Sequence, residues 1–205
     1  MTDQAELARW NARFAGENYH FGTAPNAFLV TQRHRLRQGM KALAIADGEG
    51  RNGVWLARQG CDVLSIDFSP VGLAKARKLA ASEGVAIATE CADLETWSWG
   101  TARFDLVAAI FIQFMGPDFR ELTFRRIRDV LLPGGVLILQ GYRPEQLQYK
   151  TGGPSKIENL YTAALLRAAF AAMEILHLAE HDGVVAEGEG HHGISALVDL
   201  VARKR

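Results

Sequence analysis

The fold is decided by the stretch Lys41-Ala42-Leu43-Ala44-Ile45-Ala46-Asp47-Gly48-Glu49-Gly50-Arg51-Asn52-Gly53. Residues 41–46 are a short apolar run typical of a buried strand, and residues 48–53 form a glycine-rich loop before a helix. Glycine suits a loop whose backbone a ligand approaches, or in which φ must be positive. The start of the following helix offers N–H groups and a partial positive charge to a carboxylate or phosphate. The stretch therefore predicts a strand, a ligand-binding turn and a helix.

The same alternation continues toward the C-terminus. Ser69 and Pro70 are typical of a helix start, and they directly follow an apolar strand. Apolar runs predict strands at residues 63–67, 86–91, 104–111 and 136–140, and periodicity predicts helices at 53–59, 69–84, 119–132 and 161–170. The last two strands, 173–180 and 194–202, have no helix between them and indicate an antiparallel hairpin. Strands alternating with helices predict an α/β fold with a mostly parallel sheet.

The composition favours one globular domain without a polyanionic partner. The chain has 205 residues, of which 48% are hydrophobic, and its 23 basic and 23 acidic side chains give a net charge of zero. Because neutralisation of phosphates by Lys and Arg dominates nucleic-acid affinity, we expect no nucleic-acid partner. The polar N-terminus does not resemble a signal peptide, and no apolar run reaches the ~20 residues that span a membrane, so we expect a cytoplasmic protein. Cys61 and Cys91 lack the spacing of a disulfide framework or a metal site.

Two acids follow the second and third predicted strands. Asp67 ends the second strand, where a carboxylate can accept both hydroxyls of a ribose, and Asp93 follows the third, where it can receive an adenine amino group. The alternatives are a helix cap or surface acid for Asp67 and a turn cap for Asp93. Gly48-x-Gly50-x-x-Gly53 also fits the dinucleotide fingerprint, so an NAD-type oxidoreductase is a second hypothesis for this adenosine-type site.

Several motifs in order along the chain point to one family. They are Trp10-Asn11-Ala12-Arg13-Phe14, Phe21-Gly22, Pro25-Asn26, Gly48-Glu49-Gly50-Arg51-Asn52, Ile66-Asp67-Phe68-Ser69, Asp93-Leu94, Leu132-Pro133-Gly134-Gly135, Gly152-Gly153-Pro154, Leu160-Tyr161-Thr162 and Glu187-Gly188. With them the chain resembles class I S-adenosylmethionine-dependent methyltransferases, specifically the tellurite-resistance-protein-like group. The resemblance implies a Rossmann-like fold with a seven-stranded, mostly parallel sheet, an antiparallel terminal hairpin and helices on both faces. It also implies one domain over residues 1–205, with 1–39 as an N-terminal lid segment and 40–205 as the core.

The resemblance implies S-adenosylmethionine as the cofactor and a set of residues that bind it. These are Trp10, Arg13, Ala46, Asp47, Gly48, Glu49, Gly50, Asn52, Asp67, Phe68, Ser69, Ala92, Asp93, Leu94, Ile110 and Phe111. Trp10 can instead belong to an amphipathic helix that packs on the body of the protein. The chain departs from the family at Ala44 and Ala46, where an acid and a glycine are usual, and Asp47 stands where a small residue is common. Asp47 or Glu49 is a candidate to replace the missing acid.

The acceptor is expected to be a small molecule. Methyl transfer from a sulfonium needs donor and acceptor aligned at ~3–3.5 Å, and a soft nucleophile such as a thiol or a tellurium or selenium oxyanion needs no general base. We therefore assign no catalytic acid or base. Gln113, Arg143 and His191 are candidates to contact the acceptor, although polar loops carry such residues routinely. We expect no metal site, since the paired histidines 191 and 192 lack further ligands. A non-catalytic cofactor-binding module is a third hypothesis, because of Ala44 and Ala46.

Overall fold

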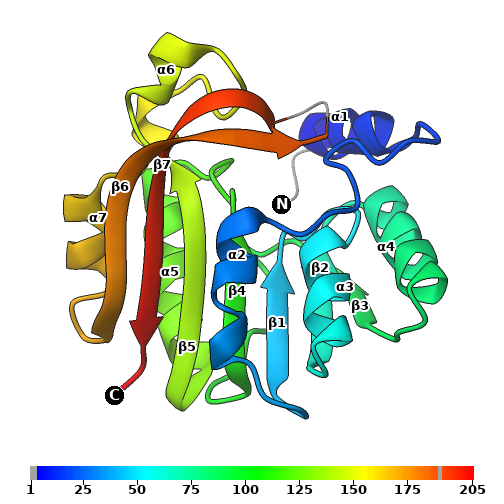
Figure 1. The fold of residues 1–205 in the computed structure, drawn as a ribbon, viewed down its shortest axis with the longest axis horizontal. Helices are drawn as coiled ribbons and strands as arrows, with labels where there is room; N and C mark the ends of the chain where they lie inside the picture. The colour runs from blue at the N-terminus through cyan, green and yellow to red at the C-terminus, as the bar shows by residue number, and fades with distance from the viewer. Residues whose placement is uncertain (1–3, 189–190) are drawn as a thin grey trace. The chain divides into compact units, whose positions relative to one another are not determined.

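The computed structural model of the chain describes residues 4–188 and 191–205. The described residues form two compact units, one from residues 4–98 with Glu187 and Gly188, the other from residues 99–186 and 191–205. Each unit contains part of the strand and helix pattern expected from the sequence (Figure 1). The assignment of residues 1–205 to one domain with a lid at 1–39 stays a prediction.

The first unit contains three parallel strands in the order β3-β2-β1. Its elements are α1 (Gln4–Phe14), α2 (Ala27–Thr31), η1 (Arg33–Arg35), β1 (Lys41–Ile45), α3 (Arg51–Arg58), β2 (Asp62–Asp67), α4 (Pro70–Ser82) and β3 (Ala88–Cys91). Apart from Lys41, every residue of β1 is buried, as its apolar run predicts. The predicted cap is confirmed, because the Ser69 side chain accepts a hydrogen bond from the N–H of Gly72 at the start of α4.

The second unit contains four strands in the order β4-β5-β7-β6. Its elements are β4 (Phe104–Ile110), α5 (Pro117–Val130), β5 (Leu131–Tyr142), α6 (Gln146–Tyr149), η2 (Ile157–Asn159), α7 (Ala163–Ala169), β6 (Glu174–Glu187) and β7 (His191–Arg203). β4 and β5 are parallel, whereas β5 and β7 are antiparallel. The predicted change from parallel to antiparallel pairing at the end of the chain is therefore confirmed.

Element boundaries differ from the sequence prediction mainly in the second unit. β5 begins at Leu131 instead of residue 136, because Leu131 already pairs with Phe104 before the register shifts across the following Pro-Gly-Gly turn. β6 and β7 are longer than predicted, since β6 continues to Glu187 and β7 already begins at His191, both within the stretch that was expected to be a loop. The short helix α6 was not predicted at all.

None of the helices in residues 4–188 and 191–205 has the length and apolar character needed to cross a membrane. This finding agrees with the absence of a long apolar run in the sequence.

Candidate functional site

The loop between β1 and α3 has an unusual backbone. Ala46, Gly48 and Gly50 have φ values of 49°, 56° and 88°, so three residues of five lie in the left-handed region. Glycine takes up this conformation at little cost, whereas a residue with a Cβ is strained there. The loop thus keeps its tight turn at the expense of strain at Ala46, the position where the family resemblance leads one to expect glycine.

The two glycines of this loop meet protein atoms. A Cβ on Gly50 would lie 2.5 Å from the Cβ and 2.8 Å from the Cα of Ala76 in α4, and a Cβ on Gly48 would lie 3.2 Å from the Phe14 ring. Of the two reasons predicted for glycine in this loop, the positive φ is confirmed at Gly48 and Gly50, and close packing against Ala76 is a further reason at Gly50. Gly50 is required because α3 and α4 approach each other closely at this point.

The carboxylate of Asp47 points back toward the sheet and the helix start. It accepts hydrogen bonds from the Gly53 N–H (3.1 Å) and the Ser65 hydroxyl (2.8 Å), and Ser65 is the register partner of Ala44 in the pairing of β1 with β2. Burial raises the pKa of Asp47 to about 7, although these hydrogen bonds oppose the shift. Asp47 therefore holds the loop by a bond to Ser65, the neighbour of Ala44. At position 44 the family resemblance leads one to expect an acid.

Asp67 joins the glycine loop to the turn that follows β2. Its carboxylate accepts hydrogen bonds from the N–H groups of Gly48 (2.9 Å) and Ser69 (2.8 Å). Only 6% of Asp67 is exposed, and burial raises its pKa to about 6. The Ser69 hydroxyl donates to the Asn11 side chain of α1 at 2.6 Å, and Phe68 between them is half-buried. Each Asp67 oxygen retains the capacity to accept a further hydrogen bond, as a ribose-binding acid requires.

The turn after β3 brings a third predicted segment to this place. The Ala92 N–H donates to the Asp67 carbonyl at 3.0 Å, and Leu94 is buried. Asp93 accepts a hydrogen bond from the N–H of Glu95 at 2.9 Å, which is the turn-capping geometry considered as the alternative for this residue. The ends of β2 and β3 thus lie together, as expected for parallel strands.

Glu49 holds the N-terminal segment. Its carboxylate accepts hydrogen bonds from the N–H groups of His20 (2.7 Å) and Phe21 (3.4 Å), and it forms an ion pair with Lys75 of α4 at 2.5 Å. Lys75 also donates to the Asn18 carbonyl at 2.6 Å. The side chain of Glu49 is therefore occupied by the protein itself, and sequence reasoning did not identify Lys75 as its partner.

The predicted lid residues of α1 pack on one another. The ring of Trp10 lies 5.4 Å from that of Phe14 and 6.2 Å from that of Phe21, and the Arg13 guanidinium lies 4.7 Å from the Trp10 ring centroid. Phe14 is buried, and α1 contacts α4. This packing corresponds to the alternative stated for Trp10, an amphipathic helix that packs on the body of the protein. The Phe14 ring lies against Gly48, so α1 lies beside the glycine loop.

Asn52, in the first turn of α3, accepts a hydrogen bond from the Asn26 N–H at 3.0 Å, and the remaining predicted residues belong to the second unit. Phe111 has a φ of 54°, and its ring stacks on Tyr142 at 4.6 Å, directly after the buried Ile110. The Gln113 amide donates to the carbonyls of Tyr142 and Asn159 and accepts from the Tyr142 N–H, so it braces the backbone.

The other two acceptor candidates also lie in the second unit. Arg143 forms ion pairs with Asp182 and Glu145. The backbone of His191 begins β7, but its side chain lies outside what the structure describes.

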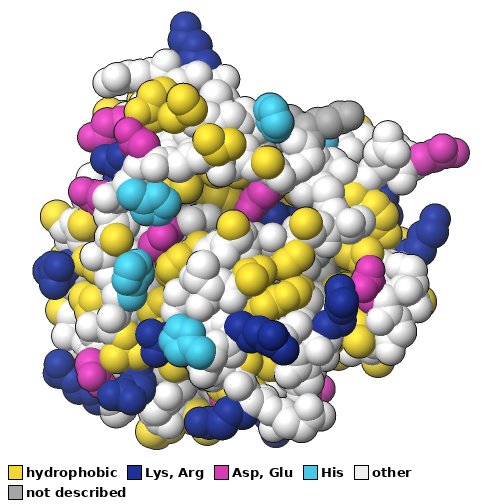
Figure 2. Space-filling view, in the orientation of Figure 1, with side chains coloured by type: hydrophobic (Ala, Val, Ile, Leu, Met, Phe, Trp, Pro, Cys, Tyr) yellow, Lys and Arg dark blue, Asp and Glu magenta, His cyan; other side chains and the backbone are white. Residues whose placement is uncertain are grey.

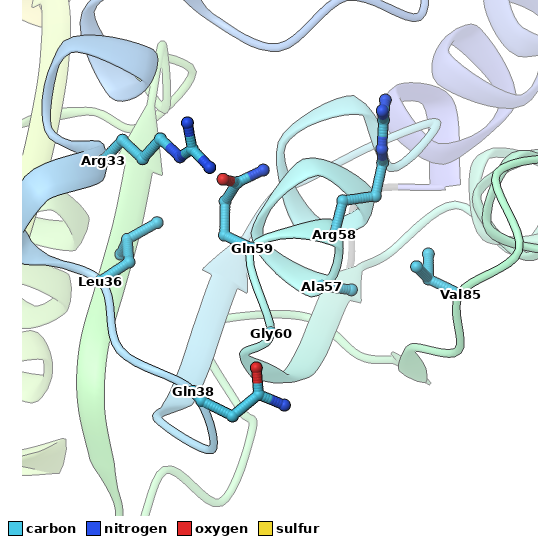
Figure 3. A pocket seen from close by; sticks show the side chains of 8 residues that line it. All are labelled: Arg33, Leu36, Gln38, Ala57, Arg58, Gln59, Gly60 and Val85. Atoms are coloured by element: carbon cyan, nitrogen blue, oxygen red, sulfur yellow. The ribbon is translucent and has the colours of Figure 1, made fainter.

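A hollow of about 330 Å³ in the first unit lies at the opposite end of β1 from the glycine loop. Figure 3 shows its lining, with Gln38 before β1 and Gly60 before β2. Half of its lining residues, Arg33, Gln38, Arg58 and Gln59, have long polar side chains, and none of the lining residues was predicted to bind the cofactor. Within residues 4–188 and 191–205, no cluster of three His, Cys, Asp or Glu side chains is arranged to hold a metal ion.

Comparison with known proteins finds a similarity over part of the chain. Residues 42–135 match the profile of a protein family described as a methyltransferase domain. A carboxy-S-adenosyl-L-methionine synthase of Geobacter sp. (strain M21) is 31% identical over 87 residues, which cover 41% of this chain and 35% of that protein. The chain thus spans about a third of the length of this curated relative.

Two solved structures resemble most of the chain. TehB from Haemophilus influenzae aligns with a TM-score of 0.73 at 18% identity, over 89% of this chain and 63% of TehB. The N-methyltransferase NodS from Bradyrhizobium japonicum WM9, in complex with S-adenosyl-L-homocysteine, aligns with a TM-score of 0.69 at 14% identity over 97% of both chains. These likenesses confirm the Rossmann-like class I methyltransferase fold predicted from the sequence.

We predict that Asp47→Asn changes how stability depends on pH. A carboxyl whose pKa rises on folding stabilises the protein while protonated, and this contribution is lost as pH increases through about 7. The free energy of unfolding of the variant relative to the parent should therefore rise by up to about 1.4 kcal/mol per pH unit between pH 5 and 7. Urea unfolding at several pH values measures it, with exposed Asp62→Asn as a control that should follow the parent.

We predict that Gly50→Ala lowers the free energy of unfolding even when no ligand is bound. The new Cβ meets Ala76 and forces a left-handed alanine, at a combined cost of about 2–4 kcal/mol. Gly84→Ala is the matched control, because Gly84 has a φ of 69° but no atom within 4 Å of the new Cβ, so only about 1–2 kcal/mol should be lost. Equal losses in the two variants, measured by urea unfolding, would contradict the helix-packing role of Gly50.

We predict that Ala44→Asp is tolerated only when Asp47 is removed. Ala44 is 1% exposed and pairs with Ser65, so a new carboxylate at position 44 would crowd that of Asp47. The double variant Ala44→Asp/Asp47→Ala should be more stable than the sum of the single changes by about 1–3 kcal/mol. Additive free energies of unfolding in a double-mutant cycle would show that the two positions do not share one acid site.

Proposed function

We propose that this chain, whose residues 42–135 match a methyltransferase-domain family, is an S-adenosylmethionine-dependent methyltransferase that acts on a small-molecule acceptor. The observation that carries the proposal is the position of Asp67, a buried carboxylate at the end of β2 that is held by the N–H of Gly48 in the glycine loop. An acid at this place beside a glycine turn is suited to accept the hydroxyls of an adenosine ribose.

The residues of the first unit fit this cofactor. Asp67 would hold the ribose, and the start of α3, whose N-cap is Gly50, would face the carboxylate of the methionine part. The turn from Ala92 to Leu94, which is joined to Asp67 by the Ala92 N–H and contains the buried Leu94, would lie along the adenine ring. Asp47, Glu49 and Asn52 use their side chains to fix the loop, so we expect the loop to contact the ligand through its backbone.

Methyl transfer requires from the protein mainly that the methyl donor and the acceptor are aligned. When bound, S-adenosylmethionine supplies a methyl group on a sulfonium that is already activated for displacement. The protein then has to orient the acceptor in line and exclude water, and such positioning accounts for much of the rate of a two-substrate reaction. A thiol or a tellurium or selenium oxyanion is a suitable acceptor class, because such soft nucleophiles need no general base.

The acceptor residues are proposed in revised roles. Because the Gln113 amide is used by backbone groups, we assign it to the support of the chain after β4. The Arg143 guanidinium is paired with Asp182 and Glu145, so its charge is already partly neutralised by the protein. A small-molecule acceptor also agrees with Figure 2, where basic side chains on the visible face are separated by neutral and acidic ones.

One observation favours a second function, a cofactor-binding module without catalysis. Ala46 carries a Cβ in a strained conformation at the point of the loop where glycine leaves room for a ligand. Turnover of S-adenosylmethionine with a panel of thiols and oxyanions separates the two functions. Methyl transfer to any of them excludes the module, whereas binding without transfer across the panel supports it.

We predict that Asp67→Asn weakens binding of S-adenosyl-L-homocysteine by about 1.5–3 kcal/mol, the range for hydrogen bonds to a charged group. Isothermal titration measures the change, and circular dichroism verifies that the variant is folded. Asp62→Asn, at the exposed start of the same strand, is the control and should bind as the parent does. The parent should show no comparable affinity for NAD(H), and tight NAD(H) binding would favour the oxidoreductase hypothesis instead.

A further inference from the structure

A buried ion pair joins two segments of the first unit that are far apart in the sequence. Arg51, the first residue of α3, donates to the carboxylate of Glu187, the last residue of β6. Their side chains are only 7% and 9% exposed. Arg51 directly follows Gly50, so the end of β6 is attached to the glycine loop itself.

Asn26 extends this pair into the N-terminal segment. Its side-chain N–H donates to Glu187 at 2.8 Å, its backbone N–H donates to the Asn52 side chain at 3.0 Å, and its side-chain oxygen accepts from Leu29 at the start of α2. Arg51 also donates to the Ala24 carbonyl. The N-terminal segment, the loop and the end of β6 therefore meet in one buried cluster.

A second connection runs through backbone packing. Gly188 has a φ of 63°, and a Cβ there would lie 2.3 Å from the His20 carbonyl oxygen and 2.6 Å from the Gly22 nitrogen. The backbone after β6 thus lies directly against residues 20–22, and Glu49 holds His20 through its N–H. Both residues that flank Gly50 therefore bind the N-terminal segment, Glu49 through His20 and Arg51 through Ala24. Arg51 also binds Glu187 at the end of β6.

Stability alone does not account for this arrangement. Replacing a buried ion pair by neutral residues of similar size often leaves stability unchanged, because the attraction is offset by the loss of hydration of both charges. What the pair does supply is a directional bond, since the Arg51 guanidinium has to meet the Glu187 carboxylate in one geometry. The cluster therefore fixes where the loop lies relative to the end of β6.

We propose that Glu187 is a positioning residue for the cofactor loop, and that the cluster of Arg51, Glu187 and Asn26 couples cofactor binding to the end of β6. The inference rests on the proposed function, because the ligand has to touch the loop. A ligand that orders the loop also orders Arg51 and, through the ion pair, Glu187 at the end of β6. Such coupling is reciprocal, so release of Glu187 weakens ligand binding.

The test compares the parent with two variants. The double variant Arg51→Met/Glu187→Gln removes both charges but keeps an oxygen that accepts from Asn26, so no buried charge is left unpaired. The control is Arg58→Gln, which breaks the exposed pair of Arg58 with Glu83 on the same helix α3. Titration with S-adenosyl-L-homocysteine gives the affinity, and hydrogen exchange of residues 20–26 and of the amides of residues 187 and 188, with and without this ligand, gives the coupling.

In the parent and in Arg58→Gln, we expect the ligand to slow exchange in both segments. The double variant should remain folded, bind the ligand about tenfold more weakly, and show no ligand-dependent slowing at residues 187 and 188. Parent-like affinity and slowing in the double variant overturn the inference alone. Absence of ligand binding in the parent overturns the proposed function, and the coupling with it.

Discussion

The first unit depends on carboxylates that accept hydrogen bonds from backbone N–H groups around a left-handed turn. A loop with alternating positive φ values cannot satisfy its own N–H groups through regular secondary structure, and buried N–H groups without acceptors are costly. The Asp47 carboxylate accepts from the Gly53 N–H at the helix start, and that of Asp67 accepts from the Gly48 N–H. The Glu49 carboxylate accepts from the His20 N–H in the N-terminal segment. Because they accept these bonds inside the protein, the carboxyls of Asp47 and Asp67 are buried, and burial raises their pKa values.

Much of the fold follows from local sequence, whereas the partners in the site do not. The apolar run of β1 and the Ser69-Pro70 start of α4 are local signals, and both elements lie where they were predicted. The placement of Asp67 beside the loop follows from strand order alone. In contrast, the need for glycine at position 50 depends on Ala76 in another helix, and no pattern around Gly50 reveals that neighbour. The boundaries of β6 and β7 were missed because both strands extend into a stretch whose glycines signal a loop.

At position 44 the chain has alanine, where the resemblance leads one to expect an acid. Counted by position, the chain lacks the acid at the end of β1. Measured in space, the Asp47 carboxylate reaches Ser65, whose register partner is Ala44, and it also holds Gly53 of α3. A three-residue shift in sequence therefore leaves a carboxylate beside the same pair of strands. The change at Ala46 has no such replacement, because its positive φ remains with a side chain present.

The strand order of the second unit has a consequence for how the chain is made. β7 is the last strand in the sequence, yet it lies between β5 and β6. During synthesis from the N-terminus, β6 is therefore made before β7, the strand that joins it to the sheet. Until β7 is made, the edge of β6 that pairs with β7 has no partner. Contacts between distant segments form late and leave strand edges exposed in the meantime. A chain cut before residue 191 lacks β7, so its sheet has unpaired edges on both β5 and β6, and such edges are sites for association with other chains.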